Sequence, residues 1–201
     1  PFFRGKEKSR PEPVEFRWAY AQAQAGVTQY TLSISESPDM QNAMSCTTGE
    51  QSILVYNLKI ATTYYWTVTA DGKTSEPVQF ATAGDAPRNL YVDGVTNVRD
   101  LGGWMTESGT RTKQGMIYRC GRMNESNTDE VHIEITESGR KVMLDLLGIK
   151  TEIDVRKDDG ETGGITASPL GESVTYYGIP MEWEGDTFNG NHNELLRVFS
   201  I

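Results

Sequence analysis

The sequence predicts a multidomain chain, with a β-sandwich over residues 14–82 and an α/β domain over residues 91–201. Short runs that alternate apolar and polar residues fill the first segment, and a period of two is the signature of half-buried strands. In the second segment helix-like runs alternate with strand-like runs, which favours an α/β layer with parallel strands. A polar lead (residues 1–13) precedes the sandwich, and small, turn-forming residues (83–90) form a predicted linker.

Composition excludes several classes of protein. Hydrophobic residues make up 37% of the 201 residues, which is enough for a packed core. No apolar run approaches the roughly 18 residues that a membrane span needs. The formal net charge is -9, with 7 basic and 8 acidic residues in 1–84 against 12 and 20 in the remainder. Because such a charge repels phosphate backbones, we expect no nucleic-acid partner.

The sandwich prediction depends on five short runs spaced about ten residues apart. Asp71-Gly72 separates the last two runs and is typical of a tight hairpin turn. The expected strands lie at residues 15–20, 30–34, 53–58, 64–69 and 77–82.

One passage carries a family resemblance. Residues 58–70 read LKIATTYYWTVTA and resemble the strand E to strand F passage of fibronectin type III domains, although Ile60 stands where that family often has Pro. The alternation of Tyr64, Trp66 and Val68 predicts that all three side chains face the opposing sheet. Core packing is also the first interpretation of the other aromatic side chains, and a carbohydrate site at Trp18 or Tyr20 is the alternative.

The second segment shows helix boundaries and strands. Thr136 is a predicted helix N-cap, and Gly148 is a predicted stop after the helix. Strands are expected at residues 149–155 and 174–179, and Asn193 is expected to cap a last helix that reaches Ile201. The apolar face of the first helix consists of Val142, Met143, Leu146 and Leu147.

Three ordered motifs carry a second resemblance. They read NVRDLGG at 97–103, YRCGR at 118–122 and LGIKTEIDVR at 147–156. Together they resemble the amino-terminal half of the atypical bacterial protein-tyrosine phosphatases, a cysteine-dependent family with dual-specificity and phosphoinositide-active members. Val98, Cys120 and Val155 are the departures, standing for Phe, Ser and Leu of that family.

The resemblance implies a nucleophilic cysteine in a Cys-x5-Arg loop, where backbone N–H groups and the arginine bind phosphoryl oxygens. Six residues after Cys46 stands Ser52, and six after Cys120 stands Ser126, so neither cysteine begins such a loop. In the family the loop follows the helix expected at 193–201 after one more strand. We therefore expect an incomplete cysteine-phosphatase-like domain, a fragment without its nucleophile that is inactive alone.

The resemblance also implies roles for charged residues. The loop 181–188 holds the candidate general acid, with Asp186 first and Glu184 second, whereas an exposed acidic loop is the default interpretation of this segment. The candidate substrate-binding residues are Arg99, Asp100, Arg119, Asp154 and Arg156. For these five residues the alternative role is structural, in local turns and ion pairs.

No metal or other cofactor is expected. The two cysteines and the two histidines, His132 and His192, have no zinc-ligand spacing. Cys46 and Cys120 are expected to be separate thiols, with a disulfide between them as the less favoured alternative. Two-metal phosphatases can also carry a fibronectin-like domain, but the sequence contains neither of their Asp-x-His and Gly-Asn-His patterns.

The sequence thus predicts a tyrosine phosphatase whose substrate is a phosphorylated protein or a phosphoinositide. The alternative is a non-catalytic phospho-binding or adhesion protein that uses the same scaffold. Analogy with other fibronectin-type modules favours a periplasmic or extracellular setting. The oligomeric state is not predicted.

Overall fold

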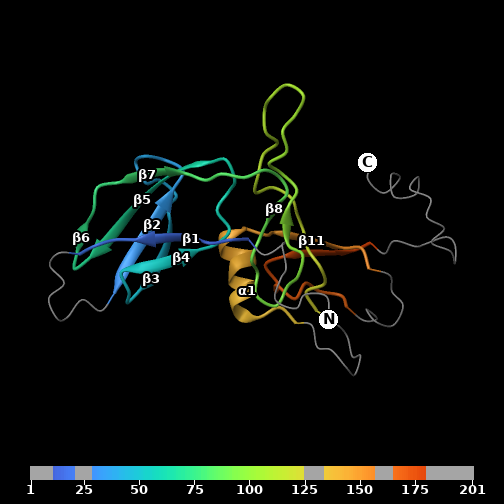
Figure 1. The fold of residues 1–201 in the computed structure, drawn as a ribbon. Coiled ribbons are helices and arrows are strands. Elements are labelled where there is room, and N and C mark those ends of the chain that lie inside the picture. Colours follow the sequence, from blue (N-terminus) through green and yellow to red (C-terminus); the bar gives the residue numbers. More distant parts are fainter. Residues whose placement is uncertain (1–10, 21–28, 125–133, 157–164, 180–201) are drawn as a thin grey trace.

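The computed structural model describes residues 11–20, 29–124, 134–156 and 165–179 (Figure 1). The described chain is rich in β-structure and has few helical residues. Strands β1 to β7 gather on one side of the molecule, and the later strands lie with the helix α1 on the other side (Figure 1). Among the described residues no helix is long and apolar enough to cross a membrane.

The first half contains two antiparallel sheets. In one, β1 pairs with β4, and in the other β2 lies between β3 and β5, while β5 also pairs with β6 and β7. The strands are β1 (Val14–Arg17), β2 (Tyr30–Ser35), β3 (Met44–Thr48), β4 (Ser52–Val55), β5 (Thr63–Ala70), β6 (Lys73–Thr74) and β7 (Val78–Ala81).

A cluster of buried side chains joins these two sheets. Phe16 of β1 lies edge-on to Trp66 of β5 at 5.4 Å and to Phe80 of β7 at 5.3 Å between ring centroids. Tyr64 and Val68 are buried in the same cluster, as the alternation along β5 predicts, while Trp66 is half-buried. Each fully buried large apolar side chain contributes about 1.5–3 kcal/mol to folding, so this cluster holds the sheets together.

Strand β3 was not predicted, whereas the Asp71-Gly72 hairpin was. The sequence analysis missed β3, whose five residues include only Met44 and Cys46 as apolar side chains. Among the described residues its only partner in the sheet is β2, so β3 is an edge strand with little to bury. The hairpin at Asp71-Gly72 is confirmed, because both residues have positive φ, 50° and 72°.

The second half contains one antiparallel and one parallel sheet. β9 lies between β8 and β10, and β11 pairs in parallel with β12, as the α/β pattern predicts. Residues 88–89 of the predicted linker are a strand of this half. The strands are β8 (Arg88–Asn89), β9 (Arg99–Asp100), β10 (Tyr118–Arg119), β11 (Thr151–Asp154) and β12 (Thr175–Gly178).

The predicted helix begins as expected and then changes from α-helical to π-helical hydrogen bonding. Helix α1 (Glu137–Lys141) is capped by Thr136, whose hydroxyl accepts the Gly139 N–H at 3.1 Å, so the predicted N-cap is confirmed. The helix continues as a π-helical turn, η1 (Val142–Leu146), in which the Leu147 N–H reaches the Val142 carbonyl. The expected face is thereby rotated: Met143 and Leu147 are buried, whereas Leu146 is 38% exposed.

A second cluster of buried residues lies beneath these elements. It includes side chains from the β8–β9 region, from the helix and from the segment before β12, such as Val98, Met143 and Val174. The predicted loop 181–188 and the predicted helix 193–201 lie outside the described residues.

Candidate functional site

Two arginines face each other across the β9–β10 pair. The register sets Arg99 directly opposite Arg119, and on the neighbouring rung Asp100 opposite Tyr118. Side chains directly opposite each other in an antiparallel pair lie about 4.5–5.5 Å apart at Cβ, and like charges there repel. An anion placed between the two guanidinium groups would remove that repulsion.

Arg99 is half-buried, and its Nε is fully buried without a hydrogen-bond partner in the described part of the chain. A buried donor without an acceptor costs about 1–3 kcal/mol. An acceptor oxygen of a bound anion would satisfy this N–H group.

Asp100 lies on the other face of β9 and is completely buried. Its Oδ2 accepts hydrogen bonds from Nη2 of Arg88 at 2.8 Å and from the Gly115 N–H at 2.7 Å. Its Oδ1 accepts the Gly102 N–H at 2.8 Å. The carboxylate therefore braces the turn after β9, and no ligand can reach it.

A second charged cluster lies at the end of β11. The guanidinium of Arg156 binds both carboxylate oxygens of Asp154, with its Nε at 2.9 and 3.0 Å from them. It also donates to the carbonyl and the side-chain oxygen of Asn124, at 2.7 and 3.0 Å. The Tyr176 hydroxyl donates to Asp154 at 3.0 Å. Arg156 is thus held rigidly by four oxygen atoms.

These contacts set the protonation of the cluster. Burial opposes ionisation of Asp154, but the hydrogen bonds and charge of Arg156 outweigh it and lower the pKa of this carboxyl. Burial and the hydrogen bond to Asp154 raise the pKa of Tyr176 to about 12. At neutral pH the cluster therefore contains an ionised Asp154, a cationic Arg156 and a neutral Tyr176.

Cys120 follows Arg119 at the end of β10 and packs against the buried core of the second half, and its thiol feels the charges of Arg119, Asp154 and Arg156. Burial, followed by the negative charge of Glu152, raises the pKa of Cys120 to about 11. A nucleophilic cysteine needs the opposite shift. Cys120 is therefore a protonated thiol at neutral pH.

Cys46 also has a pKa raised by burial, and both cysteines are free. The expectation of separate thiols is confirmed. Among the described residues, no group of three or more His, Cys, Asp and Glu side chains could hold a metal ion.

Sequence reasoning missed Glu152, which shares the face of β11 with Asp154. Burial raises the pKa of Glu152, and its carboxylate accepts a short hydrogen bond of 2.5 Å from the Ser168 hydroxyl. The period of two along residues 152, 154 and 156 was the available signal. Asn124 and Tyr176 were also missed, and no local motif marks them.

The structure thus places four of the predicted site residues in two pairs and separates a fifth. Arg99 and Arg119 stand opposite each other on neighbouring strands, and Asp154 and Arg156 form an ion pair at the end of β11. Asp100 points to the opposite face and is buried there. Asp186 and Glu184 lie outside the described residues.

Comparison with known proteins identifies one family. A family model described as a tyrosine phosphatase family matches residues 90–197, which is more than half of the chain. No curated protein matches the chain.

Proposed function

The chain belongs to the tyrosine phosphatase family, and from that premise we propose that the complete protein hydrolyses phosphomonoesters through a cysteinyl-phosphate intermediate. The substrate is a phosphorylated protein or a phosphoinositide. Residues 1–201 supply the scaffold and part of the anion site. The nucleophile belongs to a Cys-x5-Arg loop that these residues do not contain, so they are inactive alone.

The proposed chemistry has two steps. The thiolate attacks phosphorus, a sulfur–phosphorus bond forms, and the phosphorus–oxygen bond to the leaving group breaks. The leaving oxygen takes a proton from a general acid, for which Asp186 is the candidate. Water then attacks phosphorus, its proton passes to the ionised Asp186, and the sulfur–phosphorus bond breaks, which releases inorganic phosphate and restores the thiolate.

The opposed pair of Arg99 and Arg119 is the observation that carries this proposal. Two cationic side chains on one face of a short β-ribbon create a positive site in a chain whose net charge is -9. A phosphoryl group carries the charge and the oxygen atoms that two guanidinium groups bind best. The high pKa of Cys120 supports a nucleophile elsewhere.

Arg156 is proposed as the third cation of the site. Its guanidinium is already bound by Asp154 and Asn124, so it contributes positive charge from a fixed position. Asp154 is proposed to act by orienting Arg156, and Asp100 by bracing the turn that follows Arg99.

Residues 14–82 are proposed to be a fibronectin type III-like module. The support is the pair of antiparallel sheets with a shared core and the resemblance of residues 58–70. Because such modules are common in exported proteins, we propose a periplasmic or extracellular location.

Phosphate binding to the 201-residue chain tests the anion site without turnover. We expect inorganic phosphate or phosphotyrosine to shift the backbone amide resonances of Arg99 and Arg119. Arg99→Gln and Arg119→Gln should each weaken binding at least roughly five-fold, because each substitution removes one charge-assisted hydrogen bond to the anion. Arg111→Gln is the matched control, because Arg111 lies on the hairpin after β9 and pairs with Asp85, which precedes β8. Equal affinity in all variants would contradict the site.

Activity is tested on the protein extended through its Cys-x5-Arg loop. We expect p-nitrophenyl phosphate turnover that disappears when the loop cysteine becomes serine and persists in Cys120→Ser. Phosphate binding without turnover by the extended protein would favour the non-catalytic phospho-binding alternative.

A further inference from the structure

One turn of the first half is bonded directly to the second half. Residues 57–60, called here the 57–60 turn, follow β4 and precede β5. Their partners in the second half lie at residues 88–91 and 103–114. The contacts are hydrogen bonds to backbone atoms and close packing, so they fix position as well as proximity.

Asn57 makes the first connection. Its side-chain Nδ2 donates to the Tyr91 carbonyl at 2.8 Å, and its Oδ1 accepts the Tyr91 N–H at 2.7 Å. This pair of bonds imitates the exchange between two neighbouring β-strands. Asn57 has a φ of 68°, a conformation that asparagine tolerates better than most residues. The neighbouring rings of Tyr56 and Tyr91 pack at 5.0 Å between centroids.

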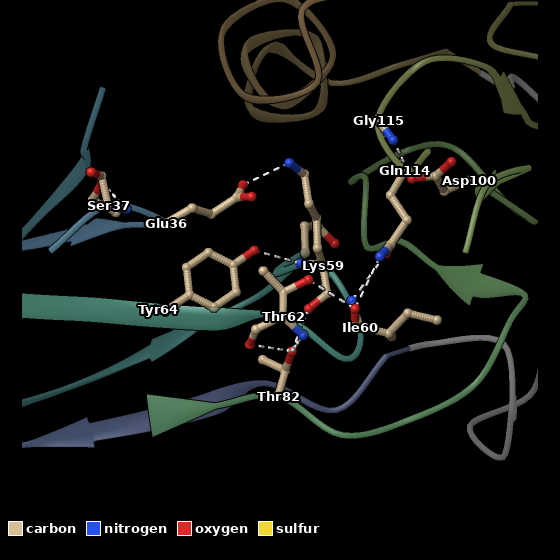
Figure 2. Close-up of polar contacts among 12 residues, drawn as sticks. Glu36, Ser37, Lys59, Ile60, Thr62, Tyr64, Thr82, Asp100, Gln114 and Gly115 are labelled. Carbon is tan, nitrogen blue, oxygen red and sulfur yellow. Dashed lines mark hydrogen bonds and ion pairs between the residues drawn. The ribbon is translucent and has the colours of Figure 1, made fainter. Parts of the chain in front are cut away.

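Gln114 makes the second connection in the same manner. Its Oε1 accepts the Ile60 N–H at 3.0 Å, and its Nε2 donates to the Ile60 carbonyl at 2.9 Å. Figure 2 shows the Gln114 side chain extended toward the backbone of Ile60. The Ile60 side chain meets Gly103, where an added Cβ would lie 3.2 Å from its Cδ1. Each half therefore donates and accepts hydrogen bonds at the backbone of the other through one amide side chain.

The turn is itself held firmly by the first half (Figure 2). The Lys59 N–H donates to the Tyr64 hydroxyl at 2.9 Å, and the Thr82 hydroxyl donates to the Lys59 carbonyl at 2.6 Å. The Lys59 ammonium pairs with Glu36 at 2.6 Å. Burial raises the pKa of Tyr64 to about 12, so its hydroxyl stays neutral and the bond persists across the physiological range. The 57–60 turn thus presents fixed backbone groups to the second half.

A chain of contacts runs from this turn to the candidate anion site. The Asn57 carbonyl accepts Nη1 of Arg88 at 3.2 Å, and Nη2 of the same arginine binds Asp100. Asp100 in turn holds the Gly102 and Gly115 N–H groups, which lie on the two sides of the hairpin that follows Arg99. The first half therefore contacts, through one buried arginine, the carboxylate that braces the anion site.

We infer that the 57–60 turn is a positioning element of the second half. Asn57 and Gln114 are the positioning residues: Asn57 acts through Arg88 and Asp100, and Gln114 acts from its place beside Gly115 on the hairpin after β9. In this view residues 14–82 are a fixed structural part of the site rather than a spacer. The coupling stands on these contacts alone, and its relevance to phosphate rests on the proposed function.

Hydrogen exchange of the 201-residue chain tests the coupling without phosphate or turnover. Asn57→Gly removes the side chain yet keeps a residue that accepts positive φ. Asn42→Gly is the matched control, because Asn42 is exposed and has a φ of 51°. Gln114→Ala removes the second connection from the other side, and Gln79→Ala is its control on the exposed side of β7.

We expect the Gly102 and Gly115 amides to exchange roughly ten-fold faster in Asn57→Gly and in Gln114→Ala than in the native chain. The amides of β2 should keep their native rates in both variants, and the two controls should change neither set. If Asn57→Gly unfolds the whole chain, Gln114→Ala decides the matter. Rates at Gly102 and Gly115 within two-fold of the controls would overturn the inference, whether or not the chain binds phosphate.

Discussion

Arg88 and Asp100 form an ion pair of 2.8 Å whose side chains are 5% and 0% exposed. Burying two charges is costly unless their remaining hydrogen-bonding groups are satisfied. Asp100 meets that condition through two backbone N–H groups, whereas the Nε of Arg88 has no partner among the described residues. The carboxylate is therefore the better satisfied member of the pair.

This asymmetry predicts unequal costs of substitution. Arg88→Met leaves Asp100 with its two N–H donors and should cost about 3 kcal/mol of unfolding free energy. Asp100→Ala leaves a buried guanidinium and two unpaired N–H groups, and should cost about 5 kcal/mol or prevent folding. Urea denaturation measures both.

The pair of Arg17 and Glu15 supplies the control for these variants, since its side chains are 75% and 42% exposed. Arg17→Met should cost less than about 0.5 kcal/mol, because exposed ion pairs contribute little. A cost for Arg88→Met as small as that of Arg17→Met would show that the buried pair does not stabilise the fold.

Gly102 is predicted to accept no side chain. A Cβ added there would lie 2.1 Å from the Lys113 carbonyl oxygen and 2.8 Å from the Gln114 Cα. Because these are backbone atoms, Gly102→Ala should cost about 3 kcal/mol in unfolding free energy. Gly109→Ala is the control: its φ of +79° is strained for alanine but no atom lies within 4 Å, so it should cost about 1 kcal/mol. Equal thermal shifts for the two variants would contradict the close approach.

Glu152 predicts a dependence of stability on pH. Because burial raises its pKa in the folded state, the protonated carboxyl favours folding, and this stabilisation is lost as the pH rises through the folded pKa. Glu152→Gln should therefore raise the unfolding free energy at pH 7, where the native side chain is ionised against the preference of the fold. Near pH 4 the variant and the native chain should have the same stability.

Urea titrations at the two pH values measure this difference. Glu172→Gln, at an exposed position, should be neutral at both. A Glu152→Gln variant that is less stable at pH 7 would mean that the ionised carboxylate is the form that the fold prefers.

Cys120 is predicted to be a slow nucleophile. With a pKa of about 11, only a very small fraction of the thiol is ionised at pH 7.5. Iodoacetamide should modify Cys120 in a Cys46→Ser background roughly 100-fold more slowly than it modifies an unfolded control in urea. Mass spectrometry follows the reaction, and fast modification at neutral pH would reopen Cys120 as a candidate nucleophile.

The sequence predicted those elements whose signal is local. Alternation located β5, turn chemistry located the Asp71-Gly72 hairpin, and capping chemistry located the start of α1. The π-helical turn after α1 was not predictable, because the apolar pattern of residues 142–147 fits a regular helix equally well. Edge strand β3 was missed because it has little to bury.

The candidate site was predictable only where residues are neighbours along the chain. Asp154 and Arg156 are two residues apart, so their pairing follows from strand geometry. The opposition of Arg99 and Arg119 depends on strand register across a hairpin of nearly twenty residues, which no local pattern fixes. The burial of Asp100 is likewise a tertiary property, since its partner Arg88 lies in the stretch predicted to be a linker.

The contact between Gln114 and Ile60 bears on which sequences this fold tolerates. Gln114 binds only backbone atoms of residue 60, so the side chain at that position can change so long as it clears Gly84 and Gly103. Proline is the exception, because it has no N–H for Gln114. Relatives that share this junction should therefore vary at position 60 without using proline whenever position 114 is glutamine, and a proline there should accompany a different residue at 114.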